Sequence, residues 1–319
     1  GVDASAIIDR IAVVFGEPFA DPSALPTFEV CAAARRYVKV ALSGDGGDEL
    51  FAGYRRYPFF VAEERIRRAT PSLARRAIIG PLGYAYPKLD WAPRPLRLKT
   101  TLQSLADDRA GAYLRAVSTC LPDRLETMLS DEFRAEAGAD DPFAAINPAH
   151  GAKSYAQATD LATWLPGRML TKIDRASMAA GLEVRTPFLD HEFASWALAL
   201  PKRYSLDAHG GKRILKRAMQ GRVDANILRR EKAGFSIPLR DWLQKSDGPL
   251  TRLRESTHWR AGGYLSTRRI EQMMETHQRG AADYSQELWT VIMFDAFLRH
   301  ASTLSKPAGR NVSARAASA

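Results

Sequence analysis

Cysteine is scarce in this 319-residue chain, and its scarcity excludes two ways of holding a protein together. Cys31 and Cys120 stand far apart and lack any metal-binding spacing. A disulfide framework or a zinc cluster requires more cysteines at short, regular intervals. We therefore expect two buried, reduced thiols in a cytoplasmic protein. The six histidines are equally scattered, and no pair of them has the spacing of metal ligands.

Long apolar runs are also absent. The most apolar stretches, such as residues 11–15, fall far short of the roughly 20 residues that a spanning helix requires. We therefore expect no membrane span. The chain begins Gly-Val-Asp, without an initiator methionine or a basic and apolar leader. It looks cut from a longer protein.

Aromatic residues are missing from the basic runs, although positive charge is in excess. The net charge is +10, from 46 lysines and arginines against 36 aspartates and glutamates. The excess is spread over short runs without the interleaved aromatics that stack on nucleic-acid bases. We therefore expect no nucleic-acid partner. A diffuse basic surface suits an anionic substrate or simply solubility.

Strands are few. Residues 38–42, with β-branched Val38 and Val40, predict a buried strand, and residues 182–184 are a short extended candidate. A helix over about 23–37 leads into the first strand, an order typical of α/β proteins with a parallel sheet. Because one strand forms no sheet, we expect its neighbours to lie upstream, in residues absent from this chain.

Most of the remaining sequence has helical periodicity. We expect one helix over residues 48–69, an extended loop over the proline-rich residues 81–95, and a largely helical C-terminal part. The fold class is therefore α/β, with a parallel sheet that is incomplete here. We predict one domain over residues 1–301 and a disordered tail over residues 302–319, which are rich in alanine, serine and arginine.

The chain is organised around a glycine-rich turn that follows the predicted strand, Ser43-Gly-Asp-Gly-Gly-Asp-Glu-Leu-Phe-Ala-Gly-Tyr54. A strand, a glycine turn and a helix start can present backbone N–H groups to a phosphate. Asp45 and Asp48 are placed to bind a hard cation or to handle a proton. The alternative is an acidic surface turn in which Asp48 merely caps the helix.

Two further stretches carry charge in unusual places. Glu183 and Arg185 lie on one side of the extended candidate, because side chains alternate along a strand. Such a pair is commonly structural. Gly210-Gly211-Lys212 places a lysine at a predicted helix start, where it opposes the helix dipole unless an anion binds there. The spacing is not that of a P-loop.

These motifs, in this order, resemble the glutamine-dependent asparagine synthetase family. The resemblance covers about residues 7–245. Besides the glycine turn, it rests on Glu17-Pro-Phe-Ala-Asp-Pro-Ser-Ala-Leu-Pro26, Lys172-Ile-Asp-Arg-Ala-Ser-Met-Ala179 with residues 181–190, Gly211-Lys-Arg-Ile-Leu-Lys216, and Lys232-Ala-Gly-Phe-Ser-Ile-Pro-Leu-Arg-Asp-Trp242. Residues 17–26 and 38–57 together also resemble the amidotransferases of exosortase and exopolysaccharide gene sets.

The resemblance implies an ATP-pyrophosphatase fold and an ATP-dependent ligase. Such an enzyme adenylates a carboxylate with ATP and Mg²⁺, releases pyrophosphate, and lets ammonia from an upstream glutaminase domain displace AMP. The implied partners are aspartate or a related small carboxylate and this ammonia. A homodimer is the assembly we consider, although the sequence leaves the oligomeric state open.

The resemblance also implies roles for residues of the glycine turn. Ser43, Gly44, Gly46 and Gly47 would contact ATP, and Asp48 would ligate Mg²⁺.

Three further residues receive catalytic roles by the same resemblance. Asp45 stands where the family often has glutamate, so its shorter side chain would have to reach the acyl-adenylate. Lys212 would meet the developing phosphate charge. Glu183 would orient the substrate or accept a proton from the attacking amine.

Two features of the family are missing from this sequence. They are a first nucleotide loop, Ser-Gly-Gly-x-Asp-Ser, and an amino-terminal cysteine nucleophile with its glutaminase domain. We therefore expect the chain to be inactive by itself. Two alternatives stay open: a non-catalytic, helical partner-binding remnant of the family, and an amidotransferase that acts on a cell-surface polysaccharide or peptide carboxylate.

Overall fold

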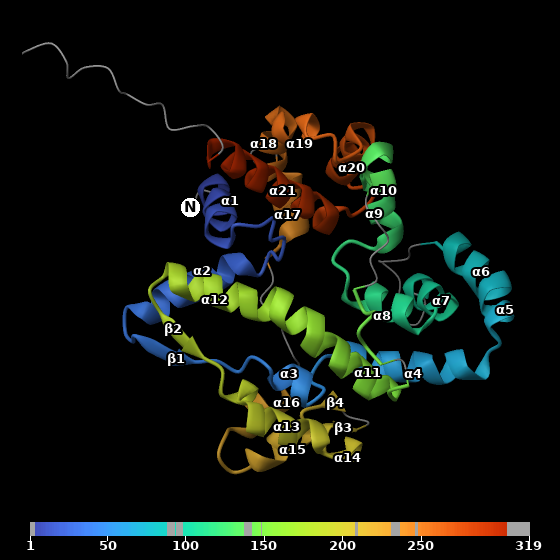
Figure 1. Ribbon diagram of the computed structural model, residues 1–319, viewed down its shortest axis with the longest axis vertical. Coiled ribbons are helices and arrows are strands. Elements are labelled where there is room, and N and C mark those ends of the chain that lie inside the picture. The colour runs from blue at the N-terminus through green and yellow to red at the C-terminus, as the bar shows by residue number, and fades with distance from the viewer. Residues whose placement is uncertain are drawn as a thin grey trace, which may run out of the picture. The chain divides into compact units, whose positions relative to one another are not determined.

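The computed structural model describes residues 4–87, 93, 98–136, 142–147, 149–207, 210–230, 237–245 and 248–304 (Figure 1). The chain divides into two compact units, each assembled from separate stretches of sequence. Unit 1 comprises Gly1–Leu25, Asp123–Gly138 and Ser236–Ala319, and unit 2 comprises Pro26–Pro122 and Ala139–Phe235. The range predicted as one domain thus contains parts of both units.

Unit 2 contains a parallel pair of strands. Strand β1 (Val40–Leu42) pairs with β2 (Glu183–Arg185), and the register sets Val40 beside Glu183 and Leu42 beside Arg185. Both predicted extended segments are therefore strands, but the predicted burial of the first was wrong, because Val40 is 48% and Leu42 75% exposed. The expectation that every neighbour of β1 lies upstream was wrong, because β2 comes from later in the same chain. Helix α12 (Thr171–Ala179) contacts β2 and runs beside the pair in Figure 1.

The other elements of unit 2 are mostly short helices, which the periodicity of the sequence favours. They are α2 (Ala24–Arg35), α3 (Gly47–Leu50), α4 (Arg56–Ala69), α5 (Ser72–Ala74), the π-helix η1 (Arg75–Ile79), α6 (Gly80–Ala85), α7 (Lys99–Ala106), α8 (Arg109–Val117), α11 (Ala152–Thr159), the π-helix η3 (Asp160–Leu170), the 3₁₀ helix η4 (Pro187–Leu189), α13 (His191–Ala199), α14 (Lys202–Ser205), the hairpin strands β3 (Leu206–Asp207) and β4 (Gly210–Gly211), α15 (Arg213–Ala218) and α16 (Ala225–Arg229).

The predicted helix over residues 48–69 is two helices, and this is a correction. Helix α3 ends at Leu50, and α4 begins only at Arg56. Between them Ala52 has a φ of 53°, a left-handed conformation that a continuing helix does not contain. The chain therefore turns directly after the glycine-rich segment.

The predicted extended loop over residues 81–95 was wrong at its start, because α6 covers residues 80–85. Pro81 lies in the first turn of α6, where the missing N–H costs no hydrogen bond. Residues 88–92 and 94–97 lie outside the described residues.

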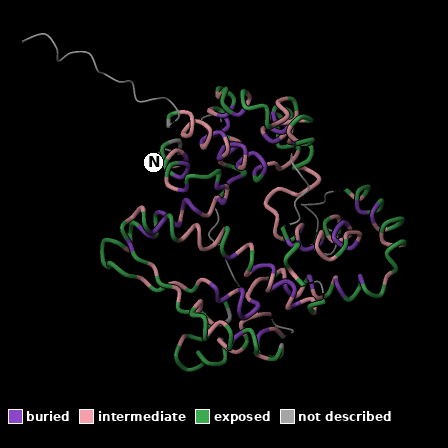
Figure 2. The backbone as a smooth tube through the Cα atoms, viewed as in Figure 1, coloured by how far each residue is buried: buried purple, intermediate pink, exposed green. Residues whose placement is uncertain are grey.

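An aromatic core holds the middle of unit 2. Tyr57 and Phe60 of α4 pack with Tyr113 of α8 and Tyr155 of α11, each of them at most 3% exposed. The rings of Phe60 and Tyr113 meet edge to face with their centroids 4.9 Å apart. Figure 2 shows buried residues gathered where α4, α8 and α11 meet.

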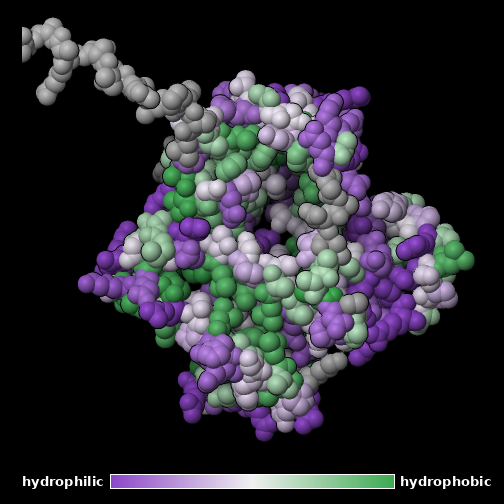
Figure 3. Space-filling model, viewed as in Figure 1, coloured by the Kyte–Doolittle hydropathy of each residue, from purple (hydrophilic) through white to green (hydrophobic). Residues whose placement is uncertain are grey.

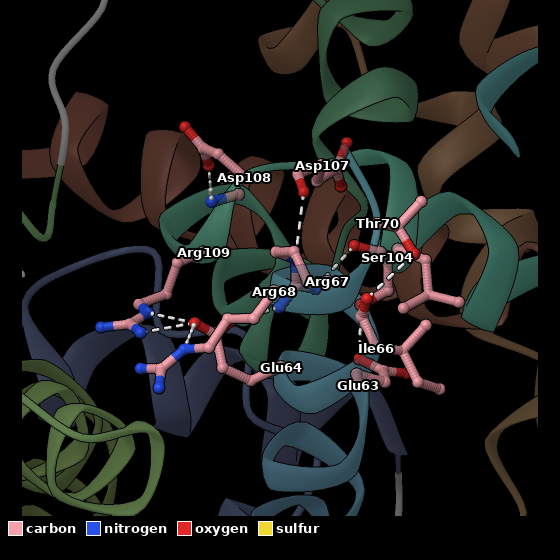
Figure 4. Close-up of polar contacts among 12 residues, drawn as sticks. Glu63, Glu64, Ile66, Arg67, Arg68, Thr70, Ser104, Asp107, Asp108 and Arg109 are labelled. Atoms are coloured by element: carbon pink, nitrogen blue, oxygen red, sulfur yellow. Dashed lines mark hydrogen bonds and ion pairs between the residues drawn. The ribbon is translucent and has the colours of Figure 1, made fainter. Parts of the chain in front are cut away.

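A buried carboxylate joins α4 to α8 beside this core. Glu64 forms ion pairs with Arg67, at 2.6 Å, and with Arg68 and Arg109 (Figure 4). Arg67 also donates to the backbone carbonyl of Ser104 at 2.9 Å, which ties α7 to the same point. The charges of these buried groups are thereby compensated within the helix cluster.

Unit 1 is a helical unit. Its elements are α1 (Ala4–Phe15), α9 (Pro122–Met128), α10 (Asp131–Glu136), α17 (Leu239–Gln244), α18 (Pro249–Glu255), α19 (His258–Ala261), α20 (Thr267–Gln278) and α21 (Ser285–Leu304). Helix α21 contacts α1, α17, α18, α19 and α20. It extends three residues into the range predicted as a tail, and residues 305–319 lie outside the described part of the chain.

In unit 1, Asp9 joins two helices of the C-terminal stretch by accepting from Arg252 at 2.6 Å and from Arg299 at 2.8 Å. The helix that opens the chain is thereby fastened to helices more than 200 residues later. Among the described residues, no helix is both long and apolar enough to cross a membrane. The two cysteines are free thiols, Cys31 buried and Cys120 partly buried, and burial raises the pKa of Cys31.

Candidate active site

The glycine turn leaves the sheet at the carboxyl end of β1. The backbone N–H of Ser43 still donates to the carbonyl of Arg185, at 2.8 Å, so the turn begins directly at the strand pair. The Ser43 hydroxyl donates to the Asp45 carboxylate. Ligands of α/β proteins commonly bind at this edge of a parallel sheet.

Gly46 and Gly47 allow the turn to pass close to the 3₁₀ helix η4 that follows β2. Gly46 has a φ of 86°, and a Cβ there would lie 2.2 Å from a methyl carbon of Leu189. A Cβ on Gly47 would approach the ring of Phe188 to 3.2 Å. Packing against Phe188 and Leu189 therefore favours glycine at both positions, and the positive φ favours it at Gly46 as well.

The structure brings Asp48 and Lys212 together. The Lys212 Nζ lies 2.9 Å from the Asp48 Oδ1, and both side chains are partly buried. The sequence suggested that Lys212 lies in the first turn of a helix, but the structure places it just before the helix. Its φ is 63°, it immediately precedes α15, and its N–H donates to the Phe51 carbonyl at 2.7 Å. This hydrogen bond docks the lysine directly on the end of α3.

Two glycines make this approach sterically feasible. A Cβ on Gly53 would lie 2.0 Å from the Asp48 Oδ1 and 2.4 Å from the Lys212 Cε. A Cβ on Gly211 would lie 1.8 Å from the Ala52 carbonyl oxygen. The two segments therefore meet backbone to backbone, and the Asp48–Lys212 pair occupies the space above Gly53.

Glu183 lies apart from this pair along the strand. The register places it beside Val40, two residues before the carboxyl end of the strands. Its half-exposed carboxylate forms an ion pair with Arg185. The sequence predicted that Glu183 and Arg185 share a face of the strand, and the structure confirms this. The catalytic role assigned to Glu183 stays a prediction.

A buried acid behind the turn escaped the sequence analysis. Glu49 is 1% exposed and accepts a hydrogen bond from the Tyr54 hydroxyl at 2.7 Å. Burial raises the pKa of the Glu49 carboxyl, and the Tyr54 hydrogen bond offsets this only in part. Gln157 of α11 donates to the backbone carbonyls of Glu49, at 2.6 Å, and Leu50, at 3.0 Å. Helix α3 is therefore held in place from behind.

Arg56 continues this support away from the turn. It forms an ion pair with the fully buried Asp160 at 2.7 Å and lies over the ring of Tyr54, 3.8 Å from the centroid. Tyr57 also donates to Asp160, at 2.5 Å. Burial raises the pKa of Asp160, and the charge of Arg56 opposes this shift. In the sequence, Asp160 stands among apolar residues such as Leu161 and Trp164, and this pattern could have predicted a buried acid.

The glycine turn carries carboxylates that Mg²⁺ could use together with phosphates. Within the described residues, no group of three or more histidine, cysteine, aspartate or glutamate side chains could hold a metal alone. Mg²⁺ commonly takes only one or two carboxylates and completes its shell with water and substrate phosphates. Asp45 and Asp48 supply such carboxylates on one turn.

Comparison with known proteins identifies the family. The family model described as asparagine synthase matches residues 2–299. A Mycobacterium bovis protein that carries the provisional name of a glutamine-hydrolyzing asparagine synthetase is 34% identical over 299 residues. Asparagine synthetase [glutamine-hydrolyzing] 1 of Bacillus subtilis is 30% identical over 295 residues. Asparagine synthetase of Homo sapiens is 27% identical over 150 residues, which are 42% of this chain and 27% of the human protein.

These matches differ in how much of each protein they cover. The first two cover 91% and 90% of this chain, but only 43% and 44% of the relatives. The chain therefore spans less than half the length of the curated relatives that it matches most fully. The resemblance stated from the motifs is confirmed, and the chain belongs to the asparagine synthase family.

Proposed function

We propose that this chain is the ATP-dependent, amide-forming part of a glutamine-dependent amidotransferase. The proposed reaction begins when a substrate carboxylate oxygen attacks the α-phosphorus of ATP, and pyrophosphate leaves. Ammonia then attacks the activated carbonyl carbon, AMP leaves, and the nitrogen loses a proton. The family membership of the chain supports an ATP-dependent ligase in general.

The observation that carries this proposal is the Asp48–Lys212 pair. Two motifs that lie far apart in the sequence meet with 2.9 Å between a carboxylate oxygen and an ammonium nitrogen. A fold with no anionic ligand gains little from a left-handed lysine at this position, because the conformation is strained and the pair is partly exposed. A phosphate-binding site uses both charges.

In this proposal the turn binds the nucleotide. The Ser43 hydroxyl and the backbone of Gly44, Gly46 and Gly47 would contact ATP, and the ammonium of Lys212 would stabilise charge that develops on the phosphates. Asp48 would hold Mg²⁺, which supplies charge neutralisation for the pyrophosphate leaving group.

Two acids remain for the acceptor. Asp45 accepts from the Ser43 hydroxyl, so a bound nucleotide or carboxylate would compete for that hydrogen bond. Glu183 would orient the acceptor or take the proton of the attacking amine, once its ion pair with Arg185 opens. We further propose that the protein has an ATP-pyrophosphatase fold and acts in the cytoplasm. It would receive ammonia from a glutaminase domain and would form a homodimer.

Aspartate is the acceptor we propose, and a sugar acid or a peptide carboxylate is the runner-up. A panel of carboxylates tested for stimulation of pyrophosphate release would separate them. A non-catalytic remnant of the family is the other alternative. It would release no pyrophosphate with any acceptor, even in the intact gene product.

The test is pyrophosphate release from ATP by the intact gene product in the presence of the acceptor. Asp48→Asn should abolish release. Lys212→Ala should slow it by about 10²–10³, the usual cost of removing a group that stabilises transition-state charge. The 319-residue chain by itself should release none.

Lys216→Ala is the matched control, because Lys216 is exposed on α15 one helical turn after Lys212. It should leave the rate unchanged. Rates at the wild-type level in Asp48→Asn or Lys212→Ala would overturn the assignments.

A further inference from the structure

The rod formed by α5, η1 and α6 turns two glycines and one arginine toward the protein. Gly80 and Gly83 are buried, and a Cβ on Gly83 would lie 3.0 Å from the Gln103 backbone nitrogen of α7. Arg75 also points inward and donates to the carbonyls of Leu105, at 3.2 Å, and Asp107, at 2.7 Å. Close backbone packing and a capped guanidinium therefore fill the inner side of the rod.

The large apolar residues of the same rod point outward. Leu73 is 78% exposed, Ile78 is 65%, Leu82 is 52% and Tyr84 is 60%. Figure 3 shows hydrophobic surface at the outer tip of α5 and α6, bordered by hydrophilic surface. An amphipathic surface helix normally buries its large apolar side chains. Here the order is reversed. We call Leu73, Ile78 and Leu82 the outer apolar face.

Positive charge flanks the outer apolar face along the chain, on the rod itself and on the preceding helix α4. Residues 65–87 contain five arginines and no aspartate or glutamate. Arg65, Arg68 and Arg76 are exposed. The preceding acids do not neutralise this surface, because Glu64 is buried against arginines and the Glu63 carboxylate accepts from Ser104 at 2.6 Å (Figure 4).

We propose that the outer apolar face, with Arg65, Arg68 and Arg76, docks on an anionic lipid bilayer. Aliphatic side chains would enter the boundary between headgroups and acyl chains, while the arginines would reach the lipid phosphates. The excess of positive charge attracts an anionic surface and repels a second copy of the same face. Nucleic acid would pair with the arginines but would leave the aliphatic side chains of Leu73, Ile78 and Leu82 in water.

The binding would be interfacial. The rod spans 14 residues, or about 20 Å, which is too short to cross a bilayer. No helix in the described part of the chain is suited to spanning a membrane. The inference is independent of the proposed catalytic function, because it uses none of the residues of the glycine turn.

Co-sedimentation of the 319-residue chain with vesicles tests the proposal. The chain should bind vesicles of phosphatidylcholine and phosphatidylglycerol at 3:1, and should stay in the supernatant with phosphatidylcholine alone. Ile78→Gln and Leu82→Gln should each lower the partition coefficient about tenfold, since each removes a buried aliphatic group. Arg76→Gln should lower it about fivefold.

Ile227→Gln is the matched control, because Ile227 is also a helical isoleucine and is 63% exposed. It should bind like the wild type. Unchanged melting temperatures would verify that the variants fold. Three results would overturn the proposal: absence from the vesicle pellet, equal binding by Ile78→Gln and Ile227→Gln, or variants that instead abolish dimerisation or oligonucleotide binding.

Discussion

Glu64 shows how one residue can couple the stability of the protein to pH. Burial raises the pKa of its carboxyl, but hydrogen bonds from Arg109 and Arg67 outweigh burial, and the pKa lies below its ordinary value of 4.5. A carboxyl whose pKa is lowered by folding stabilises the folded state above its unfolded pKa. This contribution is lost as the pH falls from about 4.5 through the folded pKa.

Glu64→Gln should therefore lower the free energy of unfolding by about 3 kcal/mol at pH 7, because it leaves buried guanidinium groups without a countercharge. The difference from the wild type should narrow as the pH falls below 4.5. Urea unfolding at a series of pH values measures both effects. Glu126→Gln, at an exposed position, is the control. A difference that widens on acidification would contradict the linkage.

For single residues, the sequence predicted which motifs matter better than it predicted which side chains contact one another. Ser43, Asp48 and Lys212 could be selected because they occur in short motifs with a recognisable order. The contacts of Glu64 with Arg109 and of Arg56 with Asp160 join residues 45 and 104 positions apart. Neither pair has a local pattern, since which charges become buried together depends on how the helices pack.

Among the elements, strands and long helices were predicted more reliably than the breaks between them. Both strands of the parallel pair, helix α2 and the helical character of the C-terminal part were predicted from the sequence pattern. The break after α3 was not predicted, because the helical spacing of apolar residues continues through it. The backbone at Ala52 is nevertheless left-handed. The region around Pro81 was predicted as a loop because proline usually ends a helix. Proline is tolerated in a first helical turn, however, and α6 begins there.

The turn between α3 and α4 gives a prediction at the same scale. Gly53→Ala would place a Cβ against the side chains of Asp48 and Lys212, which can move, so the fold should persist. The displaced pair should slow adenylation by about 10²-fold, the effect of misplacing a catalytic group by about 1 Å. Pyrophosphate release and the melting temperature, measured together in the intact gene product, test this.

The control for this change is Gly167→Ala, where an added Cβ meets no atom within 4 Å. It should leave both the rate and the melting temperature near wild type. Gly211→Ala is a useful contrast, because its Cβ would strike the Ala52 backbone and should destabilise the fold itself. A Gly53→Ala enzyme with full activity would show that the close Asp48–Lys212 approach is dispensable.

For the whole molecule, the division into two units predicts that one unit can be weakened without the other. Asp295 of unit 1 is 2% exposed and accepts from the Ser256 hydroxyl at 2.5 Å and from Arg299 at 3.0 Å. Asp295→Ala should cost about 3 kcal/mol, because it leaves the Ser256 hydroxyl and the buried Trp259 N–H without their acceptor and removes one of the two acidic partners of Arg299. Hydrogen exchange should accelerate in α18 to α21 and stay slow in α4, α8 and α11.

Glu271→Gln is the matched change at an exposed ion pair, with Arg260, and should cost less than about 1 kcal/mol. Glu64→Gln should produce the reciprocal pattern, with faster exchange in unit 2 only. If hydrogen exchange accelerated equally in the helices of both units in either variant, the two units would unfold as one.

The strand pair of unit 2 has a consequence for the order of folding. Val40 and Glu183 are neighbours in the register but 143 residues apart in the chain, and most of the helices of unit 2 lie between them. Closing so long a loop is entropically costly, so such contacts form late. The glycine turn is attached to this pair through the Ser43–Arg185 hydrogen bond. The proposed nucleotide site should therefore be completed last during folding, after the helices that support it.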